Sequence, residues 1–170
     1  MSQLAIDKLK DRFGDAVLGT HSHRGDDTAI VDRTVLVEVV KFLREDAELG
    51  FNMLIDLFGV DCVGLAGRTV LERGSHERFE VVYHFLALGP KKQRVRIKVP
   101  VSEADCAVDS ITSVWPGADW YERECWDMYG IKFAGHPNLK RIMLYDTFVG
   151  HPLRKDYVVN KRQPRVGTPH

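Results

Sequence analysis

Residues 93–99, with the sequence QRVRIKV, alternate strictly between polar and apolar side chains, and this alternation constrains the fold most. Successive side chains of a β-strand point to opposite faces of the sheet. The two predicted sets are an apolar one and a basic one, namely Val95, Ile97, Val99 and Arg94, Arg96, Lys98. A sheet that contains such a strand is covered on one face and wet on the other. The basic row could hold an acidic partner, although a solvated sheet face explains it without further assumption.

Other segments add to this sheet and predict helices to cover it. Residues 52–62 and 78–88 are rich in β-branched and aromatic side chains and predict strands, and residues 28–32 and 68–72 predict shorter ones. Apolar spacing and end signals predict the helices. These are residues 2–14, begun by Ser2 and ended by Gly14; residues 35–43, capped by Asp32 or Thr34; residues 102–115; and residues 118–130, ended by Gly130.

The element order predicts an α+β fold. We expect a two-layer domain with a mixed sheet of about five strands, helices mainly on one face, and an extended C-terminal arm. The scaffold domain is placed at residues 1–145 and the arm at residues 146–170. The arm has five Lys or Arg residues, two Asp residues and three prolines, so it is expected to be loose alone and to order on a partner.

Composition excludes several classes of function. Lys plus Arg and Asp plus Glu number 24 each, so no overall field attracts nucleic acid or an anionic membrane. We find no apolar run of the length that crosses a membrane and no phosphate-binding glycine loop. The three cysteines, Cys62, Cys106 and Cys125, form no C-x-x-C pair and are expected to be reduced in a cytoplasmic compartment.

Glu122, Glu124 and Asp127 on the predicted helix at residues 118–130 could share a proton or bind a metal. Glu122 and Glu124 are two residues apart, however, and point to different sides of a helix. Arg123 is available as a counter-charge. Structural pairing therefore explains these carboxylates better than catalysis.

His136 and His151 each stand between a glycine and a proline, in Gly-His-Pro triplets typical of tight turns. Two such turns could supply two metal ligands, but the spacing specifies no third. Histidines that hydrogen-bond to neighbouring backbone are the simpler interpretation. No nucleophile with a prescribed base is found either, since Cys125 lies on a predicted helix without a histidine beside it.

Residues 122–143 resemble the signature of the 30 kDa subunit family of respiratory complex I, which in bacteria is the C subunit of NADH-quinone oxidoreductase. The matching positions are Glu122, Arg123, Glu124, Asp127, Met128, Tyr129, His136, Lys140, Ile142 and Met143. GHPLRKDY, residues 150–157, matches the family's second hallmark, and the resemblance covers roughly residues 30–160. Val158 departs from the family, which usually has proline there.

The resemblance implies a scaffold without a catalytic, cofactor-binding or metal site of its own. Flavin mononucleotide and iron–sulfur clusters are then expected in partner subunits. The expected partners are the large 49 kDa-type subunit (the D subunit), near the quinone-reducing end, and the neighbouring iron–sulfur subunits. The implied location is peripheral, on the cytoplasmic side of the bacterial inner membrane.

On this interpretation residues 122–157 form a surface that another subunit grips. The expected interface residues are Glu122, Arg123, Glu124, Asp127, Tyr129, His136, Pro137, Lys140, His151, Pro152, Arg154, Lys155, Asp156 and Tyr157. One alternative is the homologous subunit of a membrane-bound hydrogenase or of a dehydrogenase complex with another electron donor. Another is a stand-alone metal-dependent enzyme that uses His136, His151 and a carboxylate.

Overall fold

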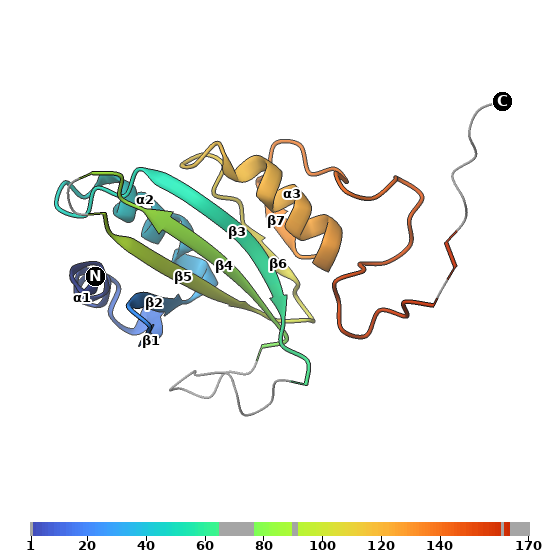
Figure 1. The fold of residues 1–170 in the computed structure, drawn as a ribbon, viewed down its shortest axis with the longest axis horizontal. Coiled ribbons are helices and arrows are strands. Elements are labelled where there is room, and N and C mark those ends of the chain that lie inside the picture. The colour runs from blue at the N-terminus through green and yellow to red at the C-terminus, as the bar shows by residue number, and fades with distance from the viewer. Residues whose placement is uncertain (1, 65–76, 90–91, 161, 164–170) are drawn as a thin grey trace.

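The computed structural model describes residues 2–64, 77–89, 92–160, 162 and 163. These residues form three α-helices, two 3-10 turns and seven strands (Figure 1). In chain order they are α1 Gln3–Phe13, η1 Gly14–Ala16, β1 Val17–His23, β2 Asp26–Val31, η2 Arg33–Val35, α2 Leu36–Glu45, β3 Met53–Asp61, β4 Phe79–Leu86, β5 Arg94–Val101, β6 Ala107–Asp109, α3 Ala118–Tyr129 and β7 Lys132–Ala134.

The main sheet has five strands in the order β1-β2-β5-β4-β3. β2 runs parallel to β5, and the other neighbouring strands are antiparallel, so the predicted mixed sheet of about five strands is confirmed. The predicted strand at residues 68–72 lies outside the described residues. β6 and β7 pair in parallel and form a second, two-stranded sheet.

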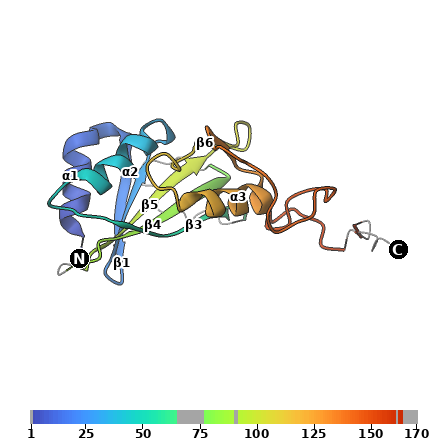
Figure 2. The same ribbon diagram turned by 90° about the horizontal axis from the view of Figure 1, so that it is seen from above.

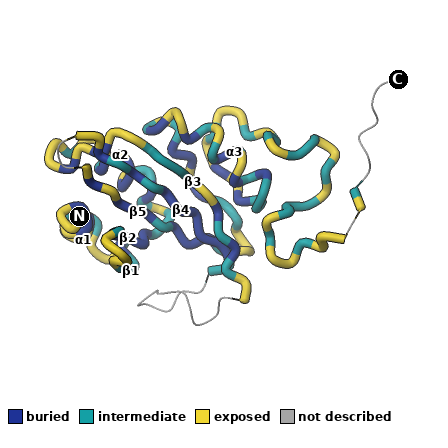
Figure 3. The backbone as a smooth tube through the Cα atoms, viewed as in Figure 1, coloured by how far each residue is buried: buried dark blue, intermediate teal, exposed yellow. Residues whose placement is uncertain are grey.

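The alternation in β5 builds the core as predicted. Val95, Ile97 and Val99 are buried, and on β4 they face the buried side chains of Phe85, Tyr83 and Val81. α1 and α2 lie side by side over this apolar face, where the rings of Phe13 and Phe42 meet edge to face (Figure 2). Most residues of β2, β4 and β5, the three inner strands of the sheet, are therefore buried (Figure 3).

The basic row of β5 lies on the opposite face, which none of the described helices covers. Lys98 Nζ is 2.8 Å from a Glu80 carboxylate oxygen, and Arg96 Nε donates to His84 Nε2 at 3.1 Å. A second nitrogen of Arg96 is 3.7 Å from Asp26. Because two of the three cations are already paired within the sheet, the solvated-face interpretation fits this row better than a site for an acidic ligand.

Two N-terminal helices begin in different ways. The Ser2 side chain does not cap α1 as predicted; its Oγ and backbone nitrogen donate to the Asp27 carboxylate at 3.1 and 2.8 Å, which ties the start of α1 to β2. The Asp32 carboxylate accepts from the Thr34 nitrogen at 2.8 Å and begins the turn that leads into α2. The apolar spacing predicted at residues 35–43 is confirmed for Leu36, Val39, Val40 and Leu43, which are all buried on α2, whereas Val35 is half-buried and lies in η2.

The predicted helix at residues 102–115 is wrong. The segment instead contains β6 and a series of turns. Its backbone finds partners outside a helix, since β6 pairs with β7 and the Ile111 nitrogen donates to the Glu122 carboxylate at 2.8 Å. Ser110 and Thr112 also bind each other through their hydroxyl groups, a local alternative to helical hydrogen bonds.

α3 packs against β3, and a glycine permits the close approach. A Cβ atom at Gly59 would lie 2.7 Å from the Tyr129 ring and 3.0 Å from the Cys125 sulfur. Gly130 ends the helix as predicted, with a positive φ of 77° that suits a residue without a side chain.

After β7 the chain runs as an irregular segment beyond α3, drawn orange to red in Figure 1. Almost all of its residues are exposed or half-buried (Figure 3). Within the described part of the chain, no helix is both long enough and apolar enough to cross a membrane.

Candidate functional site

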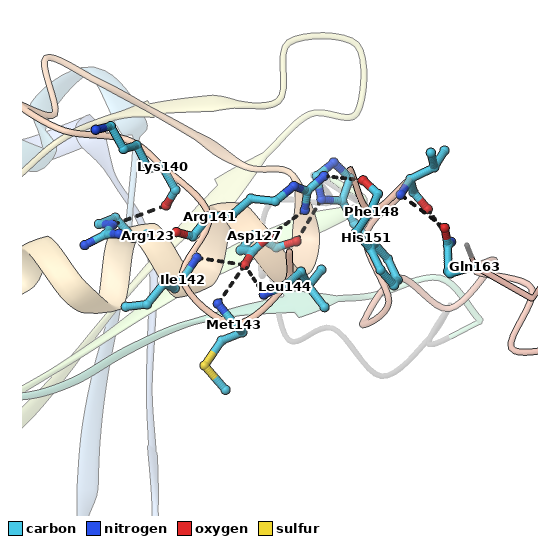
Figure 4. A network of polar contacts seen from close by, with 11 residues as sticks. Arg123, Asp127, Lys140, Arg141, Ile142, Met143, Leu144, Phe148, His151 and Gln163 are labelled. Carbon is cyan, nitrogen blue, oxygen red and sulfur yellow. Dashed lines mark hydrogen bonds and ion pairs between the residues drawn. The ribbon is translucent and has the colours of Figure 1, made fainter. Parts of the chain in front are cut away.

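The buried carboxylate of Asp127, near the end of α3, organises the segment that follows β7. Its Oδ2 accepts hydrogen bonds from the backbone nitrogens of Ile142, Met143 and Leu144 at 2.9–3.0 Å, and Oδ1 is 2.5 Å from Arg141 Nη1 (Figure 4). Burial alone would raise the Asp127 pKa, but the three backbone donors and Arg141 outweigh it and hold the pKa below its ordinary value. Asp127 is thus an ionised anchor for a chain turn.

Arg123, one helical turn before Asp127, binds the same segment through its carbonyl groups. Its Nε and Nη2 donate to the carbonyl oxygens of Lys140 and Arg141, each at 3.2 Å (Figure 4). Residues four apart share one face of a helix. Arg123 and Asp127 therefore lie on one face of α3 and bind the same turn at residues 140–144, Arg123 through carbonyl groups and Asp127 through N–H groups.

Glu122 points to the other side of α3 and into the protein. Its two carboxylate oxygens accept from Ser110 Oγ at 2.7 Å and from the Ile111 nitrogen at 2.8 Å. Burial raises the Glu122 pKa to about 7, and these two hydrogen bonds only partly oppose the shift. Glu122 fixes the turn after β6 against the start of α3.

His136 stands beside Glu122 and ties the first Gly-His-Pro turn to α3. Its side chain is fully buried, Nδ1 accepts from the Asn138 nitrogen at 3.0 Å, and Nε2 is 3.3 Å from the Asp119 carbonyl oxygen. An acceptor at Nδ1 means that the proton of the neutral ring is on Nε2. Nε2 is also 3.4 Å from the Asp119 carboxylate and 3.9 Å from that of Glu122.

The second hallmark caps the C-terminus of α3. The Asp127, Met128 and Tyr129 carbonyls have no partner within the helix. They are bound in turn by His151 Nδ1 at 2.9 Å, the Leu153 nitrogen at 3.1 Å and Arg154 Nε at 2.6 Å. Burial lowers the His151 pKa, so the ring is neutral, and the Arg154 cation suits the negative end of the helix.

The end of the second hallmark is fastened to the sheet. Arg78, just before β4, lies 2.7 Å from an oxygen of Asp156 and 3.1 Å from one of Asp61 at the end of β3. The Lys155 nitrogen donates to the same Asp61 carboxylate at 2.8 Å. The Arg78 and Arg154 guanidinium groups stack over the Phe79 ring, 4.8 and 5.0 Å from its centroid.

The structure brings most of the expected interface residues together around α3, but it turns many of them inward. Of the expected set, those whose side chains hydrogen-bond or form ion pairs within the chain are Glu122, Arg123, Asp127, His136, His151, Arg154, Asp156 and Tyr157, the last through Gln163 at 3.0 Å. Tyr129 packs on Gly59 and Pro152 is half-buried, whereas Glu124, Pro137, Lys140 and Lys155 are exposed.

Sequence reasoning missed four partners of these residues. The cation that meets Asp127 is Arg141, whereas the signature position Lys140 points outward. Ser110, Asp61 and Arg78 come from distant parts of the chain, and no spacing rule connects them to the signature.

His136 and His151 do not come together as metal ligands. The first ring contacts the Asp119 carbonyl and the second the Asp127 carbonyl, eight residues further along α3. At 1.5 Å per residue these points are about 12 Å apart, too far for one ion. Among the described residues no group of three or more His, Cys, Asp or Glu side chains could hold a metal.

Comparisons with known proteins agree with the signature. The family model described as "Respiratory-chain NADH dehydrogenase, 30 Kd subunit" matches residues 29–163. The NADH-quinone oxidoreductase C subunit of Citrifermentans bemidjiense is 46% identical over 165 residues, which are 96% of this chain and 94% of that protein. The C subunit of Geobacter sulfurreducens is 39% identical over the same shares of both chains.

A fused relative and two solved structures add context. The NADH-quinone oxidoreductase C/D subunit of Pseudomonas fluorescens is 45% identical over 156 residues, which are 91% of this chain and 26% of that protein. The trypsin-resistant fragment (1–134) of Nqo5 has a TM-score of 0.63 and 27% identity, and the match covers 79% of this chain and 99% of that one. A chain of the archaeal membrane-bound sulfane sulfur reductase shares the fold, with a TM-score of 0.68 at 17% identity over 94% of this chain and 86% of that one.

Proposed function

Because the chain belongs to the 30 kDa subunit family of respiratory-chain NADH dehydrogenase, we propose that it is a non-redox peripheral-arm subunit of a proton-translocating NADH-quinone oxidoreductase. Its role is to scaffold the 49 kDa-type subunit, the D subunit, near the quinone-reducing end. Electron transfer from NADH to quinone belongs to the assembly. This chain contributes the positions of its neighbours.

One observation supports a scaffold above all others: most of the polar side chains of the two hallmarks bind other parts of the same chain, although Glu124, Lys140 and Lys155 are exposed. Asp127 and Arg123 bind the turn at residues 140–144, and His151 and Arg154 bind the end of α3. Groups committed to backbone partners in this way are poor candidates for proton transfer or ligand binding. They suit a rigid surface, because pre-ordered elements lose little entropy on binding.

The fused relative supports the D subunit as the partner. A protein named as a C/D subunit joins the two in one chain, which favours a position close to each other. Flavin mononucleotide and the iron–sulfur clusters are assigned to partner subunits, the neighbouring iron–sulfur subunits among them. We place this chain peripherally on the cytoplasmic side of the inner membrane, attached through the complex.

A second candidate is the homologous subunit of a membrane-bound hydrogenase or of a complex with another electron donor. The fold shared with the archaeal sulfane sulfur reductase favours keeping it, because the same domain serves a different respiratory complex there. The subunits that deliver electrons distinguish the two candidates.

The test is a pull-down of the tagged chain from gently solubilised membranes of its own organism. We expect a large complex that contains flavin and iron–sulfur subunits and reduces quinone with NADH. A complex without NADH-oxidising subunits would favour the second candidate. A lone chain with stoichiometric metal would overturn both.

A further inference from the structure

Glu124 differs from the other charged residues of the first signature in its surroundings. Glu122, Arg123 and Asp127 each bind another part of the chain. Within the part of the chain that the structure describes, the Glu124 side chain takes part in no hydrogen bond or ion pair, and it is exposed. The side chains of Glu122, Arg123 and Asp127 therefore stabilise the fold. The Glu124 side chain is available to contact another protein.

The neighbours of Glu124 on α3 make this side of the helix unusual. Trp120, Glu124 and Met128 recur every four residues and so lie along one stripe. Trp120 is 63% exposed, and the Arg123 guanidinium stacks over its ring at 5.1 Å from the centroid. The opposite side of α3 is occupied, since Cys125 packs towards β3. On this stripe Trp120 and Glu124 are exposed and Met128 is half-buried.

Two further apolar side chains flank this stripe and are held there by backbone hydrogen bonds. Met143 is 64% exposed, and its nitrogen donates to Asp127; its side chain points away from that carboxylate (Figure 4). Leu153 is 48% exposed, and its nitrogen donates to the Met128 carbonyl. We call Trp120, Glu124, Met128, Met143 and Leu153 the α3 patch.

We propose that the α3 patch is the docking surface for the large D subunit, with a Lys or Arg of that partner meeting Glu124. Trp and Met are enriched at the cores of protein–protein interfaces, and Trp side chains often carry much of the binding free energy. A single carboxylate among them selects a partner with a cation at that point. The inference rests on the proposed function and on the fused C/D relative, which favours the D subunit as the occupant.

The hallmarks then have a different role from the one expected from sequence. Asp127 and Arg123 hold the turn that carries Met143, and the helix cap formed by the second hallmark holds Leu153. The inward residues thus position the docking surface, and the residues of the patch contact the partner.

A photo-crosslinking amino acid identifies the occupant directly. We place p-benzoylphenylalanine at position 120 of the full chain, in its own organism, and irradiate intact membranes. The matched control is position 88, where Leu88 is similarly exposed at 60% in the loop after β4. A crosslink to the D subunit from position 120 and none from position 88 is expected. A crosslink from position 120 to any other protein, or to the D subunit equally from both positions, overturns the proposal.

Substitutions test the energetic part. Trp120→Asp and Glu124→Arg should each lower the recovery of the D subunit with the tagged chain at least about tenfold, as expected for central interface residues. Leu88→Asp, the control, should leave recovery at the wild-type amount. The thermal midpoint of each purified variant chain is measured in parallel, and we expect the wild-type value because both side chains are exposed.

The outcomes separate this inference from the proposed function. If the wild-type chain recovers neither the D subunit nor NADH-quinone reductase activity, the proposed function fails, and this inference fails with it. If the wild type recovers the D subunit but Trp120→Asp and Glu124→Arg recover it equally well, the proposed function stands and the α3 patch is the wrong surface.

Discussion

At the scale of single residues, the Asp127 carboxylate both orders a chain turn and pairs with a cation. One carboxylate replaces the hydrogen-bond partners that a strand or helix would give to three successive N–H groups. It also balances Arg141, whose second nitrogen donates to the Phe148 carbonyl at 3.0 Å. The turn at residues 141–144 has no regular secondary structure of its own and depends on this anion.

Asp127→Asn tests that dependence, because it keeps the shape and removes the charge. We expect a loss of about 3 kcal/mol in the free energy of unfolding, since the half-buried Arg141 cation and the three backbone N–H groups lose the buried anion that binds them. Urea unfolding of the purified chain measures the change. Asp146→Asn, at an exposed position of the same segment, should change stability by less than about 0.5 kcal/mol. Equal effects of the two substitutions would contradict this account.

The raised pKa of Glu122 predicts that its contribution to the stability of the fold decreases as pH rises, whereas that of most carboxylates increases. Its pKa of about 7 in the folded chain exceeds the ordinary value of 4.5, so the folded state binds the proton more tightly than the unfolded one. Its contribution to stability is fully present below about pH 4.5 and is lost as pH rises through about 7.

Between pH 5 and pH 8 this contribution should fall by about 2 kcal/mol, and Glu122→Gln should remove it. Glutamine can still bind Ser110 and the Ile111 nitrogen. Urea unfolding of both proteins at the two pH values gives the difference. A glutamine variant that keeps the full wild-type dependence would show that another group titrates.

The sequence predicted that Glu122 and Glu124 point to different sides, because that follows from helical geometry. It also predicted histidines bound to backbone. It did not predict that Arg141 rather than Lys140 meets Asp127, since this depends on the path of an irregular turn. It also did not predict that Ser110 binds Glu122. The helix predicted at residues 102–115 would have placed the Ser110 hydroxyl elsewhere.

At the scale of elements, the longer strands and the short β2 were predicted, whereas β1, β6 and β7 were not. β5 and α2 carry clear apolar periods and β4 is rich in β-branched and aromatic residues, and the bounds of β4, β5, α2 and α3 agree closely with the prediction. β6 and β7 have three residues each, too few to show a period, and they exist because they pair with each other across α3. β1 contains Gly19 and two histidines, which give little strand propensity, and it forms by pairing with β2.

Gly130 is where α3 and its cap meet, and Gly130→Ala tests the cap. The new Cβ would lie 2.6 Å from His151 Nε2 and from Arg154 Nη2, at a φ of 77°. Backbone strain at residue 130 and displacement of the His151 and Arg154 side chains should together lower the free energy of unfolding by more than about 1 kcal/mol. Amide exchange at residues 151–157 should become faster. Hydrogen exchange with mass spectrometry measures the second effect.

Gly117→Ala is the matched control for this substitution, since its φ is −64° and a Cβ there would meet nothing within 4 Å. It should leave exchange at residues 151–157 unchanged. Fast exchange in the wild type at these residues would mean that the second hallmark does not cap the helix in solution.

At the scale of the whole molecule, Arg78, Arg154 and Phe79 join the end of the sheet to the segment that leaves α3. The sequence predicted an arm that is loose alone, and the division at residue 145 stays a prediction. Residues 151–157 nonetheless bind both α3 and the sheet, so the arm can hold its shape up to residue 157 before any partner arrives.

This arrangement predicts how Arg154→Ala affects the complex. The Tyr129 carbonyl loses its donor and Phe79 loses a stacked cation, and both contacts hold the second hallmark against α3 and the sheet. The amount of assembled complex should therefore fall several-fold, while the quinone-reductase turnover of each assembled complex stays at the wild-type value. Native gels quantify the complex, and NADH-quinone reductase activity per complex gives the turnover.

Lys155→Ala is the control, because only the Lys155 backbone nitrogen forms a hydrogen bond and the side chain is exposed. Wild-type amounts of complex with abolished turnover would mean that Arg154 acts in the reaction and not in holding the surface on which the complex is built.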